Sequence, residues 1–134
     1  MSLYDQSVVK VSLAPAEVTD GTANGTAVDR GVNGGMQDAM LVVTTGVVTD
    51  GSHAVAIQDS ANGSTGWAAV DASQLTGAAP TVDNADDGAV FEVGIRSTRR
   101  YLRAVVVTTG STTGAFIGAH IVLSSPRNAP VTRA

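Results

Sequence analysis

The residues with the most evident capacity for chemistry are the carboxylates of the segment Asp83-Asn84-Ala85-Asp86-Asp87-Gly88. Aspartate at the first and fifth positions and glycine at the sixth partly match a calcium-binding EF-hand loop. The match fails at the third position, where Ala85 has no side-chain oxygen, and at the twelfth, where Gly94 replaces the bidentate glutamate. We interpret the segment as a turn-forming acidic loop. Its candidate ligands for weak calcium binding of another kind are Asp83, Asp86 and Asp87.

Catalytic machinery is hard to assemble from the remaining residues. The two histidines, His53 and His120, lie inside predicted strands with no acidic residue at a metal-ligand spacing. The sequence contains no G-x-S-x-G, P-loop or H-E-x-x-H motif. A serine or threonine nucleophile needs a general base, and the chain has one lysine and two glutamates. We therefore expect a protein that is not an enzyme and that has no cofactor.

The densest basic cluster is Arg99-Arg100-Tyr101-Leu102-Arg103. Strand alternation places Arg99, Tyr101 and Arg103 on one side. One interpretation is a docking patch for an acidic protein surface. The other is structural, with Arg103 paired to Glu92 of the preceding strand. Both remain open, and Arg99, Arg100, Tyr101 and Arg103 are candidate interface residues.

Composition narrows the class of partner. The 134 residues fit one domain, and without cysteine the chain suits assembly in a reducing cytoplasm. A net charge of −4 with a single lysine argues against nucleic acid as the partner. The first six residues lack the basic and apolar regions of a signal peptide, and no apolar run is long enough to span a membrane. Since only 15% of residues are charged, we expect a near-neutral surface suited to broad contact with another protein.

The elements that position these residues are predicted to be strands. Valine and threonine are abundant, and strand-length runs recur between Gly, Asn and Asp. This spacing is typical of an all-β sandwich or barrel, and we expect an antiparallel β-sandwich, jelly-roll-like, of about eight strands. The expected strands are 7–13, 25–29, 39–49 (with a bulge or bend at Gly46), 53–58, 67–70, 89–95, 100–108 and 115–123. Asp50-Gly51 predicts a hairpin turn, and 71–75 a single helical turn capped by Asp71.

The last predicted strand, 115–123, is apolar on both faces, since Ile117 and Ile121 oppose Phe116, His120 and Val122. In a small sandwich, such a strand needs a cover on its outer face. A neighbouring subunit and a covering loop are both open explanations. Phe116 and His120 are therefore candidate interface residues.

Both ends are predicted to be extended arms around a central sandwich. Residues 1–6 form the N-terminal arm, 7–123 the sandwich domain, and 124–134 a tail extended by its prolines. Such tails often reach a neighbour in an assembly. Pro126, Arg127 and Pro130 are the tail's candidate interface residues.

Four segments carry a resemblance to a known family: 41–53, 58–67, 94–105 and 125–130. Their order resembles a group of small proteins from the structural gene clusters of tailed phages and prophages. In that group an Asp-Gly turn leads to a second turn, then to a strand of the pattern Y-R-G-x-K-R-Y-V-R-V, and a Pro-containing tail closes the chain. Here Ile95-Arg96-Ser97 departs from Y-R-G. The resemblance spans about residues 38–131, and no motif in it is catalytic.

The resemblance implies a virion head protein of the capsid decoration (cement) type, a β-sandwich or jelly roll on the outer capsid surface. The implied partners are the major capsid protein and further copies of the chain, as a dimer or trimer. Two rival functions remain open at this point. One is a virion-displayed carbohydrate or host-surface binding module, with Trp67 and Tyr4 or Tyr101 as a stacking platform. The other is a structural protein of the neck or tail.

Overall fold

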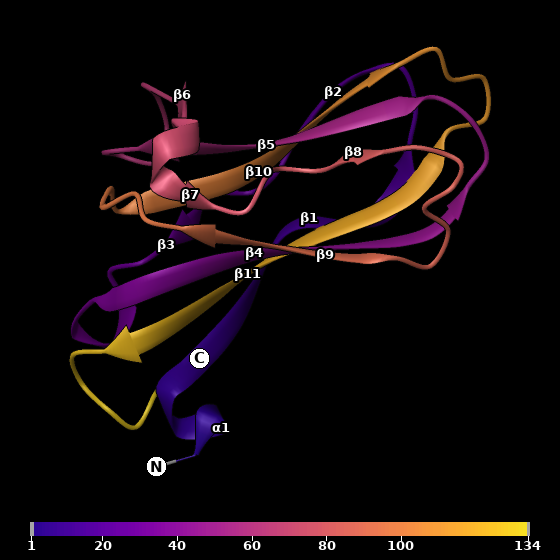
Figure 1. Ribbon diagram of the computed structural model, residues 1–134. Helices are drawn as coiled ribbons and strands as arrows, with labels where there is room; N and C mark the ends of the chain where they lie inside the picture. Colours follow the sequence, from indigo (N-terminus) through magenta and orange to yellow (C-terminus); the bar gives the residue numbers. More distant parts are fainter. Residues whose placement is uncertain (1, 134) are drawn as a thin grey trace.

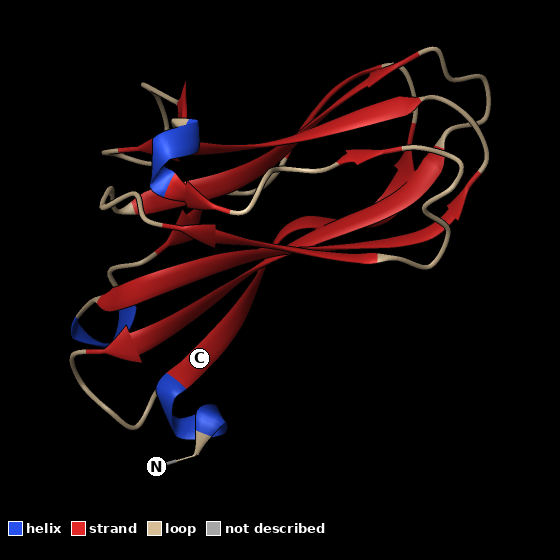
Figure 2. Ribbon diagram, in the orientation of Figure 1, coloured by secondary structure: helices blue, strands red, loops and turns tan. Residues whose placement is uncertain are grey.

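The computed structural model describes residues 2–133, which form two antiparallel sheets packed face to face (Figure 1 and Figure 2). Sheet A has the order β1-β11-β4-β9-β7. Sheet B has the order β2-β10-β5-β6, with β3 also paired to β10 and β8 to β5. The predicted all-β sandwich is confirmed. Eleven strands are described, more than the expected eight or so, because four of them are two-residue pieces.

Long strands supply most of both layers. Sheet A consists of β1 (Ser7–Val18), β11 (Ala115–Pro126), β4 (Met36–Val48), β9 (Val90–Ile95) and β7 (Leu75–Thr76). Sheet B consists of β2 (Gly21–Asn24), β3 (Val28–Asp29), β10 (Tyr101–Thr109), β5 (Ser52–Ser60), β6 (Ala68–Ala69) and β8 (Thr81–Val82). Three short helical segments complete the described elements: α1 (Leu3–Gln6), η1 (Val32–Gly34) and η2 (Ala72–Gln74).

The helical turn predicted at 71–75 is present as η2. The Asp71 carboxylate accepts a hydrogen bond from the Ser73 amide at 3.2 Å, the N-cap interaction that this sequence favours. None of the three helices in residues 2–133 is long and apolar enough to cross a lipid bilayer.

Period-two alternation determines which side chains enter the core. In β10, Leu102, Ala104 and Val106 are fully buried between the sheets, whereas Val107 points outward and is 42% exposed. In β9, Val93 is buried while Glu92 is exposed on the other face. The core also takes the inward residues of β4 and β11, including Leu41, Val43, Ile117, Ile121 and Leu123.

The prediction of a hairpin at Asp50-Gly51 is wrong. β4 belongs to sheet A and β5 to sheet B, so the turn carries the chain from one layer to the other. Gly51 still provides the left-handed backbone conformation of the turn, with φ of 91°. The Asp50 carboxylate accepts hydrogen bonds from the amides of Thr112, Thr113 and Gly114, and so ties this turn to the loop before β11.

A bulge in β1 joins the two sheets. The register between β1 and β11 shifts on both sides of Leu13, and β1 continues through Pro15, beyond the predicted end of the strand. At the bulge, the buried Ser12 hydroxyl accepts from the Ala104 amide of β10 at 2.9 Å and donates to the Thr26 carbonyl at 2.9 Å. Gly46 likewise lies at an irregularity of β4, where the register with β11 shifts between Ala115 and Ile117, so the predicted bulge is confirmed.

The two ends of the chain lie together rather than as free arms (Figure 1). β11 continues to Pro126, and the following residues turn back, with the Val131 amide donating to the Asp5 carbonyl at 2.8 Å. At the start of the chain, Ser2 caps α1 in a capping box with Asp5. Met1 and Ala134, which the sequence assigned to the arms, lie outside the described residues.

Candidate functional site

On the outer face of sheet A, mostly apolar side chains from neighbouring strands line up in rows across the sheet. Cross-strand pairing places Val9, Val122 and Met40 in one row and Val11, His120 and Val42 in the next. Each row crosses β1, β11 and β4. On this face, the side chains that the sequence placed opposite the core, Phe116 and His120, are brought together with valines of β1 that the sequence analysis did not single out.

Several of these side chains are strongly exposed to solvent. The large apolar residues on the outer face of sheet A with 49–63% of their surface exposed are Val9, Val11, Val47, Val90 and Phe116. Single exposed valines are ordinary, but a contiguous apolar sheet face is typical of an interaction surface. Charged residues are also paired on this face: Glu17 lies opposite Phe116, Glu92 opposite Val42, and Asp38 opposite Ser124.

One small part of this face is covered from within the chain. A Cβ on Gly118 would lie 2.9 Å from Cγ of Pro15, so the β1 bulge folds over the middle of β11 there. This contact accounts for the burial of Gly118. It leaves Val11 and Phe116 about half exposed, at 50% and 49% of their surfaces.

Three of the predicted interface arginines meet in a second candidate site, which we call the arginine pocket. This hollow of about 360 Å³ is lined by Arg30, Gly31, Gly35, Met36, Gln37, Thr98, Arg99, Arg100 and Arg127. Residues distant in sequence come together here, because the loop before β4, the loop before β10 and the residue after β11 adjoin at one end of the sandwich. The loop glycines give room for arginines. A Cβ on Gly31 would lie 2.8 Å from Nε of Arg100, and one on Gly35 would lie 3.6 Å from Nε of Arg127.

Arg30, which the sequence analysis missed, is the buried member of the pocket at 8% exposure. Its guanidinium donates to the backbone carbonyls of Ser97, Arg99 and Gln37, the last at 2.9 Å. Burial lowers the pKa of Arg30, and the charge of Asp38 partly offsets this. The signal for it was slight: a single arginine in the segment Arg30-Gly31-Val32-Asn33-Gly34-Gly35 has no periodicity to reveal its position.

The rim arginines differ in their ion pairs. Arg100 forms a two-point ion pair with Asp29, at 2.8 and 2.9 Å. These hydrogen bonds lower the pKa of Asp29 and raise that of Arg100. Arg99 lies 3.7 Å from Asp59. In residues 2–133, neither Arg30 nor Arg127 has a carboxylate oxygen within 4.0 Å.

Tyr101 and Arg103 lie elsewhere, on the outer face of sheet B. The expected pairing of Arg103 with Glu92 is wrong, because β10 pairs with β5 in sheet B and Glu92 is on β9 of sheet A. Arg103 instead donates from Nε and Nη2 to Gln58 Oε1, at 2.9 and 2.6 Å, and lies 4.3 Å from the centre of the Trp67 ring. Arg100 lies 5.2 Å from the centre of the Tyr101 ring.

The acidic loop uses its carboxylates to hold the backbone. Asp83 accepts from the Ala85 amide at 2.9 Å, Asp86 from the Asp83 amide at 3.0 Å, and Asp87 from the Val48 amide at 2.8 Å. Asp87 thus binds the backbone of β4, whereas Asp83 and Asp86 bind the backbone of the loop itself. Across residues 2–133, no group of three or more His, Cys, Asp or Glu side chains is placed to hold a metal ion. The three hydrogen bonds that these carboxylates accept from backbone amides support the turn-forming interpretation of this loop.

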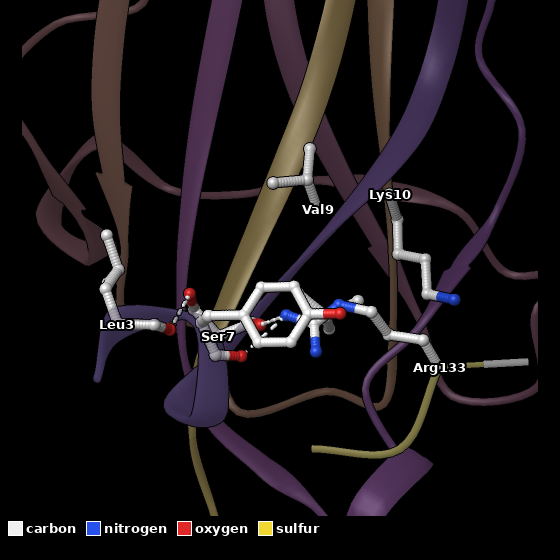
Figure 3. A pocket seen from close by; sticks show the side chains of 7 residues that line it. Leu3, Ser7, Val9, Lys10 and Arg133 are labelled. Atoms are coloured by element: carbon white, nitrogen blue, oxygen red, sulfur yellow. Dashed lines mark hydrogen bonds between the residues drawn. The ribbon is translucent and has the colours of Figure 1, made fainter. Parts of the chain in front are cut away.

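A shallow hollow lies where the two ends of the chain meet, and Figure 3 shows Leu3, Ser7, Val9, Lys10 and Arg133 around it. Arg133 donates to the carbonyls of Tyr4 and Ser7, both at 2.6 Å, and its guanidinium lies 3.7 Å from the centre of the Tyr4 ring. Of the candidate tail residues, Pro126 ends β11, Arg127 lines the arginine pocket, and Pro130 is exposed in the returning segment.

Two packed antiparallel sheets define the chain as a β-sandwich protein. No protein-family model and no curated protein matches the sequence. Among solved structures, the fold is similar to that of PBSX exported protein XepA, with a TM-score of 0.58 and 16% sequence identity. The match covers 94% of this chain, which spans 40% of that chain. At this identity the likeness establishes a shared fold.

Proposed function

We propose that this chain is a decoration (cement) protein that binds the outside of a tailed-phage head and stabilises contacts between major capsid proteins. The observation that carries the proposal is the exposed apolar outer face of sheet A, with Val9, Val11 and Phe116 each about half exposed. A flat face of this kind fits a broad protein surface better than it fits a small molecule. The phage-related structural neighbour supports the same setting. The chain would act on the outer capsid surface of the virion, after assembly in the host cytoplasm.

The size of the face sets the mode of binding. The strands β1, β11, β4 and β9 span 12, 12, 13 and 6 residues. At about 3.3 Å per residue and about 4.8 Å between strands, they give a planar footprint of about 700 Å². A stable protein interface buries about 800 Å² on each partner. One face alone is therefore slightly smaller than a standard interface, and a dimer or trimer of the chain, engaging several capsid subunits at once, adds affinity by avidity.

The stabilising effect follows from mass action. A protein that binds the expanded shell and not the dissociated or immature shell shifts the equilibrium toward the expanded one. Neither an active site nor a bound cofactor is needed. The net charge of −4 disfavours contact with the packaged DNA, which is consistent with a position outside the shell.

The carbohydrate-binding alternative is less well supported by the aromatic side chains. Trp67, Tyr4 and Tyr101 each have an arginine guanidinium within 5.2 Å of the ring centre, so none is a bare stacking surface. The neck or tail alternative predicts a different number of copies of the chain per virion. A decoration protein is present in hundreds of copies per head, whereas a neck protein forms a single ring.

The test is a heat challenge of particles produced with and without the chain. Particles that lack it are expected to release their DNA at a lower temperature, and adding back the purified protein is expected to restore the release temperature. Equal release temperatures with and without the chain would contradict the proposed stabilising function.

A further inference from the structure

The arginine pocket contains more positive charge than its own carboxylates neutralise. Arg99 and Arg100 have Asp59 and Asp29 as ion-pair partners. Arg30 and Arg127 have no such partner within 4.0 Å in the described residues, although Asp38 contributes a longer-range field at Arg30. A buried arginine paired only with carbonyl groups is electrostatically incomplete, because dipoles compensate a full charge less well than a carboxylate does.

The donors of this pocket also remain partly free. A guanidinium has five N–H donors, and Arg30 directs three hydrogen bonds to the carbonyls of Ser97, Arg99 and Gln37. Arg127 is exposed and forms no side-chain hydrogen bond in the part of the chain that the structure describes, while its amide donates to the Gly35 carbonyl. Gly31 leaves room for Arg100 beside the pocket, since a Cβ at Gly31 would lie 2.8 Å from Nε of Arg100.

We infer that the arginine pocket binds a carboxylate presented by an acidic segment of a partner protein, with Arg127 and Arg30 as the recognising groups. A carboxylate matches the planar fork of a guanidinium by two parallel hydrogen bonds. The hollow of about 360 Å³ accommodates one or two side chains. This inference rests on the proposed function only for the identity of the partner, which would be the major capsid protein.

The surroundings favour a carboxylate over a nucleic acid. Nucleic-acid binding needs basic groups spread along a path of several phosphates, whereas this pocket is a single depression bordered by Asp29, Asp38 and Asp59.

The experiment titrates the full chain, without any capsid, with the blocked peptide acetyl-Gly-Glu-Glu-Gly-amide and follows backbone amide shifts by NMR. Saturable shifts are expected at Gly31, Gly35 and Arg127. The Arg127→Gln variant is expected to raise the dissociation constant of the peptide about tenfold, since it removes a charged hydrogen-bonding group. Arg96→Gln, a matched exposed arginine outside the pocket, should change it less than about twofold. Arg127 is exposed at the rim, so its replacement should leave the fold intact, as the unshifted remainder of the spectrum would confirm.

Two further titrations decide the chemistry. The Gln-Gln peptide should produce no saturable shifts, and inorganic phosphate should bind more weakly than the Glu-Glu peptide. Equal binding of the two peptides, an unaffected Arg127→Gln variant, or tighter binding of phosphate would each overturn the inference. If the chain binds phage heads but not the Glu-Glu peptide, the carboxylate site is rejected and the decoration function stands. If the chain binds the peptide but not phage heads, the decoration function is rejected and the carboxylate site stands.

Discussion

Val11 of the edge strand β1 lies directly opposite His120 of β11, on the outer face of sheet A. Val11 keeps 50% of its surface exposed, so replacing it should disturb the surface and not the core. The Val11→Lys variant is expected to change the free energy of unfolding by less than about 0.5 kcal/mol. The same variant should bind phage heads at least about tenfold more weakly, because a lysine in an apolar contact must be desolvated.

The matched control is Val107→Lys. Val107 is also an exposed valine, at 42%, but it lies on the outer face of sheet B. Urea unfolding and binding to heads, measured for both variants, separate a docking face from a general effect of added charge. Equal loss of binding in both variants would argue against sheet A as the contact.

The Ser12 hydroxyl joins the two sheets at a single buried point. In Ser12→Ala the Ala104 amide loses its acceptor and the Thr26 carbonyl loses a donor. The cost of an unsatisfied buried group predicts a loss of about 1–3 kcal/mol in the free energy of unfolding. Urea denaturation measures it, with Ser73→Ala as the control because the exposed Ser73 forms its hydrogen bond through the backbone amide. A loss no larger than in the control would show that the bridge contributes little.

The Asp50 carboxylate makes stability depend on acid pH. Hydrogen bonds from the amides of Gly114, Thr113 and Thr112 lower the pKa of Asp50 below its ordinary value. A lowered folded-state pKa means stabilisation that is fully present above the unfolded pKa of about 3.9 and is lost as pH falls through the folded pKa. The unfolding temperature of the wild type should therefore fall below about pH 4 more steeply than that of Asp50→Asn.

Asp20 contributes in the same direction, since hydrogen bonds from Ser111 lower its pKa. The variant Asp50→Asn therefore flattens the acid dependence without abolishing it. Thermal unfolding between pH 6 and pH 2.5 measures both curves, and Glu17→Gln, on the exposed face of β1, serves as the control. Parallel curves for the wild type and Asp50→Asn would contradict the assigned interaction.

Arg103 covers Trp67, the single tryptophan of the chain, which makes the contact directly observable. The Arg103→Ala variant should shift tryptophan emission to longer wavelength as water reaches the ring. It should also lower the free energy of unfolding by about 0.5–1 kcal/mol, the usual range for an exposed cation–π contact. Fluorescence and urea unfolding measure the two effects, with Arg96→Ala as the control. Unchanged emission would mean that the guanidinium does not shield the ring.

The strands that sequence predicts well are those with strong alternation. The faces of β10 and β9 follow directly from Leu102, Ala104 and Val106 and from Phe91, Val93 and Ile95, because side-chain direction in a strand is a local property. Strands such as β7 and β8 escape prediction. They have two residues each and exist only because β9 and β5 offer them pairing edges.

Partner choice between strands is the part that local pattern cannot provide. Arg103 and Glu92 lie on consecutive strands, which often pair, yet the loop between those strands crosses from sheet A to sheet B. The arginine pocket has the same origin. Arg30, Arg99 and Arg127 are far apart in sequence and meet only through the packing of three loops. Their common location is a property of the tertiary fold.

The most direct test of the decoration function is saturation binding of the purified chain to expanded heads that are encoded by the same genome and lack the chain. A decoration protein is expected to bind until saturation at hundreds of copies per head, to dissociate slowly, and to bind unexpanded shells weakly. Absence of saturable binding, or saturation at a single ring of copies, would contradict the decoration function.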